Sequence, residues 1–246
     1  MNRRTMLRGG ASLMLAATLA LAGCGSSDNG GGGGGLLGGD KKDASVALTE
    51  ATTKMQETSY KTKMDLGGLG TMTGVSDGKK KVHEFVMDVT TQGQTVNTTM
   101  RIIDGVTYMK MKMDGASTLP GFDGKTWRKI EGGGPGSLGG FDASQMTKSL
   151  QSAVDAKWEG DVIKGTIDMS KSAESLGLGG QAAAQVAGKS VPFEAKLDGE
   201  GRLTNYKLDM SSLGAAGGAS KYDITYSDYG TPVDVQVPPA SEIAKS

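Results

Sequence analysis

The chain has 246 residues, with 27 Lys and Arg against 27 Asp and Glu, so its formal net charge is zero. This balance argues against a nucleic-acid-binding domain, which concentrates basic residues on one face or arm. A single Cys excludes an internal disulfide framework and a zinc site built from several cysteines, and a single His removes most hydrolytic triads and His-rich metal sites. The length fits one domain, or two small ones at most.

The N-terminus has the pattern of an export signal. Three arginines within the first eight residues precede the uncharged apolar stretch 11–22, which is too short for a membrane span of about 20 residues. The stretch ends in Leu21-Ala22-Gly23-Cys24, which resembles a bacterial lipobox. The alternative is a chance Cys after a secretory signal. We predict that residues 1–23 are a lipoprotein signal peptide. After its removal, Cys24 is expected to be the N-terminal residue, with a diacylglyceryl group on its sulfur and a fatty acid such as palmitate on its amino group.

The export route and the membrane anchor follow from the same segment. Residues 2–8 resemble a twin-arginine export motif, although an ordinary Sec signal explains the adjacent arginines equally well. Removal of residues 1–23 removes three arginines and no acid, leaving 24 basic against 27 acidic residues and a net charge of −3. Because a mildly acidic protein is not attracted to anionic headgroups, acyl chains are expected to hold it on the extracytoplasmic face of the cell membrane.

Residues 24–43 are dominated by glycine and have no hydrophobic periodicity. Such a segment cannot bury enough apolar surface to fold, and we predict a flexible tether with a reach on the order of 25 Å. Residues 44–246 are then expected to form one globular lipid-binding domain.

Helical periodicity occurs in three segments of this domain. From residue 44 to about 59, Ala47, Leu48, Ala51 and Met55 form one stripe, and Asp43 or Ser45 is positioned to cap its start. A second helix is expected over residues 142–156, with Met146, Leu150 and Val154 on one stripe. Residues 170–187 are also rich in helix-forming residues, although glycines interrupt their middle.

Most of the remaining chain alternates apolar and polar residues with a period of two, which is typical of strands with one buried face. Five Asp-Gly pairs, at 77–78, 104–105, 114–115, 123–124 and 198–199, favour the positive φ angles of tight turns and predict antiparallel pairing. We therefore predict an α+β fold in which a large antiparallel sheet packs with a few helices. The expected buried strand residues are Phe85, Met87, Val89, Val96, Met100, Ile102, Thr107, Met109, Met111, Met113, Trp158, Ile163, Ile167, Val191, Phe193, Ala195, Leu197, Tyr206, Leu208, Met210, Tyr222, Ile224 and Tyr226.

The order of several segments resembles a known family. The lipobox, the glycine tether and a helix into Tyr60-Lys61-Thr62 are followed by the segments 104–110 and 124–130 and the ending 229–240. Together they resemble the actinobacterial LppX/LprG-type lipoproteins, whose fold is similar to that of the LolA and LolB lipoprotein carriers. The resemblance implies an incomplete curved antiparallel barrel that wraps around helices and encloses an apolar cavity for acylated lipids or glycolipids. The glycine-rich segments 131–140 and 176–188 depart from this pattern.

Methionine is unusually frequent, with 14 in the chain. Its flexible, polarisable side chain fills irregular spaces and adapts to varied apolar partners, which suits a pocket for acyl chains. An ordinary filled core explains the same residues equally well. A Cu(I) site at Met109, Met111 and Met113 is a further interpretation, but copper proteins of this kind usually add His or Cys ligands. The predicted cavity lining comprises Phe85, Met87, Met100, Ile102, Met109, Met111, Met113, Met146, Leu150 and Val154.

No sequence feature indicates an enzyme or a cofactor. His83 lies in a strand pattern with no nucleophile beside it, and Lys79-Lys80-Lys81 is expected to be a solvated hairpin end or, as a minority interpretation, a contact for an anionic headgroup. The leading hypothesis is a membrane-anchored lipoprotein that binds a lipid for transport or shielding, with envelope transport proteins as partners. The alternatives are a scaffold lipoprotein with a filled core, which recognises another envelope protein, and a sensor.

Overall fold

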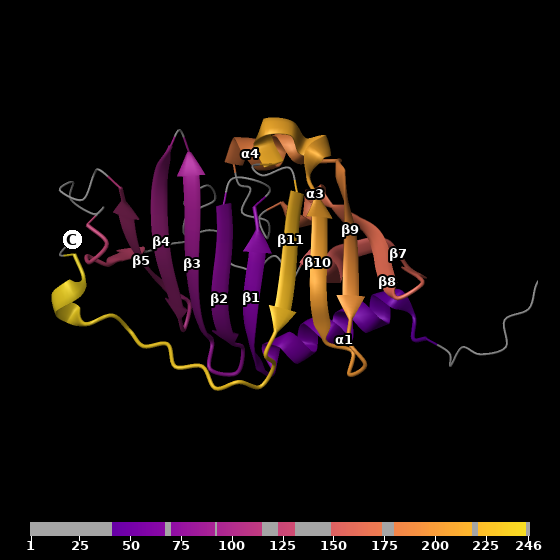
Figure 1. Ribbon diagram of the computed structural model, residues 1–246. Helices are drawn as coiled ribbons and strands as arrows, with labels where there is room; N and C mark the ends of the chain where they lie inside the picture. The colour runs from indigo at the N-terminus through magenta and orange to yellow at the C-terminus, as the bar shows by residue number, and fades with distance from the viewer. Residues whose placement is uncertain are drawn as a thin grey trace, which may run out of the picture. The chain divides into compact units, whose positions relative to one another are not determined.

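One sheet of 11 strands dominates the computed structural model, in the order β6-β5-β4-β3-β2-β1-β11-β10-β9-β8-β7 (Figure 1). The structure describes residues 41–66, 70–91, 93–114, 123–130, 149–173, 180–217 and 221–244, and residues 40–246 form one compact unit. The strands are β1 (Ser59–Asp65), β2 (Gly70–Asp77), β3 (Val82–Thr91), β4 (Gln94–Ile103), β5 (Val106–Met113), β6 (Arg128–Ile130), β7 (Ala153–Glu159), β8 (Val162–Asp168), β9 (Ser190–Leu197), β10 (Leu203–Asp209) and β11 (Lys221–Ser227). The helices are α1 (Ala44–Gln56), α3 (Met169–Ser172) and α4 (Gly180–Val186), with 3-10 helices η2 (Leu150–Ser152), η4 (Ser211–Gly217) and η5 (Ala240–Glu242).

The chain enters and leaves this sheet at its centre. From β1, successive antiparallel pairings lead to β6 at one edge. The chain resumes with β7 at the opposite edge and returns through β8, β9 and β10 to β11, which pairs with β1. The predicted α+β class with a large antiparallel sheet is therefore confirmed. The pairing of β1 with β11 joins the first and last strands, which local patterning does not reveal.

The tight turns use the Asp-Gly pairs in two different ways. Between β4 and β5, Asp104 and Gly105 have φ angles of 49° and 81°, and Gly124 before β6 has a φ of 70°. These residues have the positive φ values that the pairs predict. Gly115 lies outside the described residues.

The pairs at 77–78 and 198–199 lie in turns between antiparallel strands, as predicted, but neither Gly78 nor Gly199 has the expected positive φ angle. Gly78 is needed for a close approach instead. A Cβ there would lie 2.4 Å from the carbonyl oxygen of Gln56, because the β2–β3 turn packs directly on the end of α1. Gly199 has open space around its Cα, and Asp198 orders that turn by accepting hydrogen bonds from the backbone of Glu200 and Arg202, each at 2.9 Å.

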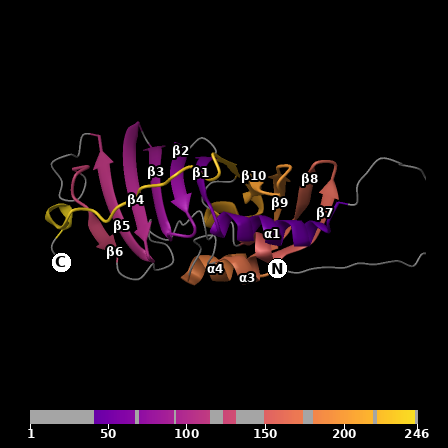
Figure 2. The ribbon, with the colours of Figure 1, turned by 90° about the horizontal axis from the view of Figure 1, so that it is seen from below.

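Helix α1 begins where the sequence predicts and ends three residues earlier than expected. The Asp43 side chain accepts hydrogen bonds from the N–H groups of Ser45 at 2.9 Å and Val46 at 3.3 Å, which have no partner inside the helix. Helices α1, α3 and α4 all lie on one side of the sheet (Figure 2), which we name the inner face. The predicted stripe of α1, with Ala47, Leu48, Ala51 and Met55, is buried.

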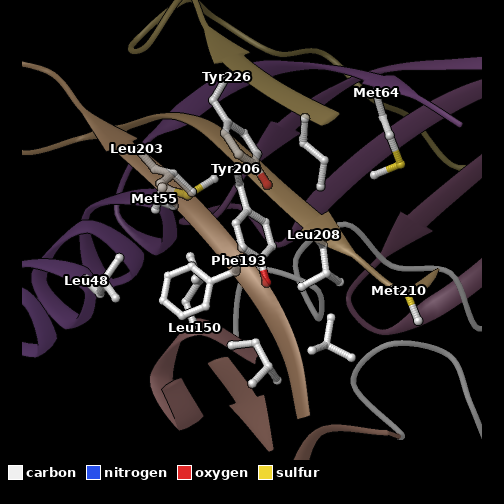
Figure 3. Close-up of a cluster of buried hydrophobic side chains, with 14 of the residues drawn as sticks. Leu48, Met55, Met64, Leu150, Phe193, Leu203, Tyr206, Leu208, Met210 and Tyr226 are labelled. Atoms are coloured by element: carbon white, nitrogen blue, oxygen red, sulfur yellow. The ribbon is translucent and has the colours of Figure 1, made fainter. Parts of the chain in front are cut away.

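The main core lies against the inner face. Side chains from α1, η2, β9, β10 and β11 converge there, and Tyr206 lies near its centre (Figure 3). The residues labelled in that view are Leu48, Met55, Met64, Leu150, Phe193, Leu203, Tyr206, Leu208, Met210 and Tyr226.

The helix expected over residues 142–156 is wrong in its last part. Residues 142–148 lie outside the described residues, Leu150–Ser152 form a 3-10 turn, and β7 begins at Ala153. Ala153 pairs with Ile167 of β8, so sheet hydrogen bonds override the local helical pattern. The helical tendency of residues 170–187 is confirmed in α3 and α4, and residues 174–179 between them are not described.

The C-terminal segment crosses the ends of β2–β5 and reaches β6 (Figures 1 and 2). Lys80 donates a hydrogen bond to the carbonyl of Val233 at 3.1 Å, and Arg101 donates one to the carbonyl of Gln236 at 3.0 Å. The backbone of Trp127 then exchanges hydrogen bonds of 2.7 and 2.8 Å with residues 242 and 244. The expected hairpin end at residues 79–81 thus also holds the C-terminal segment.

Candidate functional site

The predicted lining residues of β3, β4 and β5 share the inner face. Cross-strand pairing aligns Phe85 with Met100, and Met100 with Met109. Because side chains directly opposite in a ladder point to the same side, these residues form one continuous surface. The remaining strand members of the predicted set, Met87, Ile102, Met111 and Met113, occupy the same face.

A row of methionines crosses this surface. Met64 of β1 pairs with Met72 of β2, which pairs with Met87 of β3, and the row continues through Thr98 to Met111 of β5. We name these five positions the methionine row. The sequence analysis missed Met64 and Met72, although their period-two spacing from Thr62 and Gly74 carries the same signal.

Burial differs along the surface. Phe85, Met100, Ile102, Met109 and Met111 are buried, each less than a tenth exposed. Met87 and Met113 are partly buried, and Met87 packs against the main core. The apolar surface of β3–β5 is therefore shielded from solvent. On the opposite face Asp88 and Lys112 are exposed, whereas Glu84, Arg101 and Lys110 are half-buried.

The three lining residues expected from the 142–156 helix have different positions. Leu150 is buried in the core (Figure 3), and Met146 lies outside the described residues. Val154 is 38% exposed on the edge strand β7, so its assignment to a helix that lines the cavity is wrong. The change from turn to strand at Ala153 breaks the helical spacing that placed Val154 beside Leu150.

Buried hydroxyl groups connect α1 to the sheet. The Tyr206 hydroxyl lies 3.2 Å from Ser149 Oγ, and Gln151 Nε2 donates to Thr52 Oγ1 at 3.2 Å. Complete burial raises the pKa of the Tyr206 phenol, because the ionised form loses its solvation. Tyr206 therefore stays a neutral, hydrogen-bonding core residue at ordinary pH.

His83 lies in the middle of the sheet, on strand β3. Its ring is stacked on Phe85, with centroids 6.2 Å apart and an interplanar angle of 9°, and it lies between Ser76 and Ile102 in the ladders. Within the described part of the chain, no three His, Cys, Asp or Glu side chains form a group suited to a metal ion.

Met109, Met111 and Met113 lie on one face of β5. Both the copper interpretation and the packing interpretation require this arrangement. Their cross-strand neighbours on β4 are Met100, Thr98 and Val96, none of which is a His or Cys ligand. This environment favours packing over metal binding, and both interpretations stay predictions.

The outer face of β1, β11, β10 and β9 is charged and solvated. Over β2–β5 the outer face is partly covered instead, because Val82 packs with Val233 and Val235 in a second small core. A groove of about 370 Å³ crosses β1, β11, β10 and β9, and cross-strand ion pairs such as Lys207–Asp223 at 3.2 Å lie along it. Two further grooves, of about 510 and 310 Å³, flank α1 and the β9–β10 turn. Among the predicted lining residues that the structure describes, none borders any of these three grooves.

The N-terminal end of α1 is fastened to the β7–β8 hairpin. Trp158 Nε1 donates a hydrogen bond to the carbonyl of Lys42 at 2.8 Å, and the Lys41 ammonium lies 4.8 Å from the centre of the Trp158 ring. These contacts hold residues 41 and 42 against the hairpin. None of the described helices is long and apolar enough to span a membrane.

Comparisons with known proteins give no family assignment. No protein-family model matches the chain, and no curated protein has significant sequence similarity to it.

Proposed function

We propose that this protein is a membrane-anchored envelope lipoprotein that binds an acylated lipid or glycolipid between its sheet and its helices. The observation that carries the proposal is the continuous, methionine-rich inner face of β1–β5. An exposed acyl chain costs about 0.8 kcal/mol per CH₂ in water, so a lipid that crosses an aqueous layer needs an apolar container. Methionine adapts to chains of different shape better than branched side chains do.

The architecture and the N-terminus add support. An open antiparallel sheet with its helices on one side suits an incomplete barrel of the LolA type. The lipobox-like segment before Cys24 suits a diacylglyceryl anchor on the extracytoplasmic face of the membrane. In this proposal the protein is not an enzyme and uses no cofactor, and it transfers or shields the lipid with envelope transport proteins as partners.

A scaffold lipoprotein with a filled core is the second candidate. Its specific support is the close burial of Met64 and Met72, together with the charged outer groove, which offers a surface for a protein partner. In that case cross-linking in intact cells yields one dominant protein partner and no bound lipid.

The test uses the mature chain, residues 24–246, with Cys24→Ser, so that lipid from the anchor does not contribute. The protein is purified from a native-like host, and the organic extract is analysed by mass spectrometry. We expect about one lipid per chain. A lipid-free extract, with no thermal stabilisation by added phospholipid or glycolipid, would refute lipid carriage.

Two matched variants locate the lipid within the fold. Met111→Gln places a polar group of similar length on the inner face, whereas Lys112→Gln changes the next residue on the solvated face. We expect Met111→Gln to lower the lipid content and Lys112→Gln to leave it unchanged. Equal lipid content in both variants would place the lipid away from β5.

A further inference from the structure

Two hydroxyl groups at the centre of the inner face differ from the other buried hydroxyls of this core. Thr62 is 3% exposed and Ser76 is fully buried. Among the described residues, neither Thr62 Oγ1 nor Ser76 Oγ has a hydrogen-bond partner. The hydroxyls beneath α1 are paired, as Ser152 Oγ and Ser172 Oγ at 2.6 Å illustrate. An unpaired buried hydroxyl carries a free-energy penalty, and each such group in a native core requires an explanation.

The register places the two hydroxyls close together. Thr62 pairs with Gly74, and Tyr60 pairs with Ser76, so Thr62 and Ser76 are diagonal neighbours on the same face of β1 and β2. Diagonal neighbours in an antiparallel pair are separated by about 7–8 Å or less. A polar group that lies between the two side chains is therefore within hydrogen-bond reach of both.

The pair lies between polar aromatic side chains and an apolar row. In the ladders Ser76 lies between Tyr60 and His83, and Thr62 lies between Gly74 and Tyr226. Met64 follows Thr62 on the inner face of β1, and Met72 precedes Gly74 on that of β2, so the methionine row runs directly beside the hydroxyls. The ring of Phe85 covers Gly74, because a Cβ on Gly74 would lie 2.3 Å from Phe85 Cδ1. A polar pair beside a long apolar row matches a molecule with one polar linkage attached to a hydrocarbon chain.

We propose that Thr62 and Ser76 bind the ester carbonyl of the acylated ligand, with its acyl chain along the methionine row. This inference rests on the proposed lipid-binding function. Both hydroxyls donate hydrogen bonds, and the ester carbonyl oxygen has two lone pairs to accept them. Displacement of the flexible methionine side chains makes room for the chain. The two hydroxyls then discriminate ester-linked lipids from ether-linked lipids of the same length.

The experiment compares two synthetic probes. Dipalmitoyl phosphatidylcholine carries ester carbonyls, and its dihexadecyl ether analogue does not. The mature chain with Cys24→Ser is incubated with vesicles that contain equal amounts of both, and native mass spectrometry counts each bound lipid. We expect the ester lipid to be preferred about two- to tenfold, the effect of one or two hydrogen bonds. The double variant Thr62→Val/Ser76→Ala should bind both lipids equally.

The outcomes separate this inference from the proposed function. Binding of neither probe, with no native lipid retained, refutes the lipid-binding function. Binding of both probes without preference, or an unchanged preference in the double variant, refutes the ester contact while lipid binding stands.

Thermal unfolding of the lipid-free protein adds a readout that does not depend on the probes. Thr62→Val removes an unpaired hydroxyl and should raise the Tm, whereas Thr52→Val removes a hydroxyl bonded to Thr49 and Gln151 and should lower it. A lower Tm for Thr62→Val would mean that the hydroxyl already has a partner, and the inference would fall.

Discussion

The contact between Gly74 and Phe85 gives a quantitative test of the inner face. A methyl group on Gly74 would lie 2.3 and 2.8 Å from two carbons of the Phe85 ring and 2.9 Å from the carbonyl oxygen of Glu84. Overpacking of this kind costs about 1–3 kcal/mol. Replacement of a strand glycine by alanine recovers about 0.5–1 kcal/mol of backbone entropy. Gly74→Ala should therefore lower the free energy of unfolding, by up to about 2.5 kcal/mol.

The destabilisation should be smaller when the ring is absent. Phe85 is buried, and Phe85→Ala alone should cost about 3–5 kcal/mol. In that background the methyl group of Gly74→Ala no longer meets the ring, and only the contact with the carbonyl oxygen of Glu84 at 2.9 Å remains, so the second change should cost less than in the wild type. The coupling free energy between the two sites should then be about 1–3 kcal/mol.

Urea unfolding of the wild type, the two single variants and the double variant measures this coupling. Equal m values for the four proteins would show that the variants unfold from comparable native states. If Phe85→Ala does not fold, Phe85→Leu replaces it in the cycle. Additivity within about 0.5 kcal/mol would refute the packing of Phe85 over Gly74, because independent sites behave in that way.

Three further predictions test the turns and the buried hydroxyls. Gly78→Ala should destabilise the protein clearly, because its methyl group meets the backbone at the end of α1, whereas Gly199→Ala, in open space, should be close to neutral in the same urea assay. Hydrogen bonds from the backbone and hydroxyl of its own turn lower the pKa of Asp123 from 3.8 to about 2. Its stabilising contribution is therefore complete above about pH 4 and lost as the pH falls through 2, and Asp123→Asn should flatten that part of a stability–pH curve; an unchanged curve would contradict this assignment. Tyr206→Phe should cost about 0.5–1.5 kcal/mol through the lost bond to Ser149 Oγ at 3.2 Å, and an unchanged free energy of unfolding would show that this bond does not stabilise the core.

Where the sequence prediction failed, a pairing partner distant in sequence decided the outcome. Val154 has helical spacing from Leu150, but its backbone pairs with Thr166 of β8 and its side chain is solvent-exposed. The sequence predicted a positive φ angle at Gly78, but glycine is required there because the end of α1 packs against it. Neither the pairing of Val154 nor the packing of Gly78 against α1 can be predicted from the sequence immediately around these residues.

The sequence alone determined the faces of the strands, the start of α1 and the sites of the turns. Period-two alternation already placed Met87 with Phe85, Met100 with Ile102, and Met111 with Met109, because successive side chains within one strand point to opposite faces. Only the tertiary structure decided that the first and last strands are neighbours. The pairing of β1 with β11 placed Met64 and Thr62 at the centre of the sheet, and the unpaired hydroxyls of Thr62 and Ser76 became recognisable only there. The physical reason is that burial and hydrogen bonding depend on residues that are neighbours in space. A local sequence pattern contains one partner of such a contact and does not identify the other.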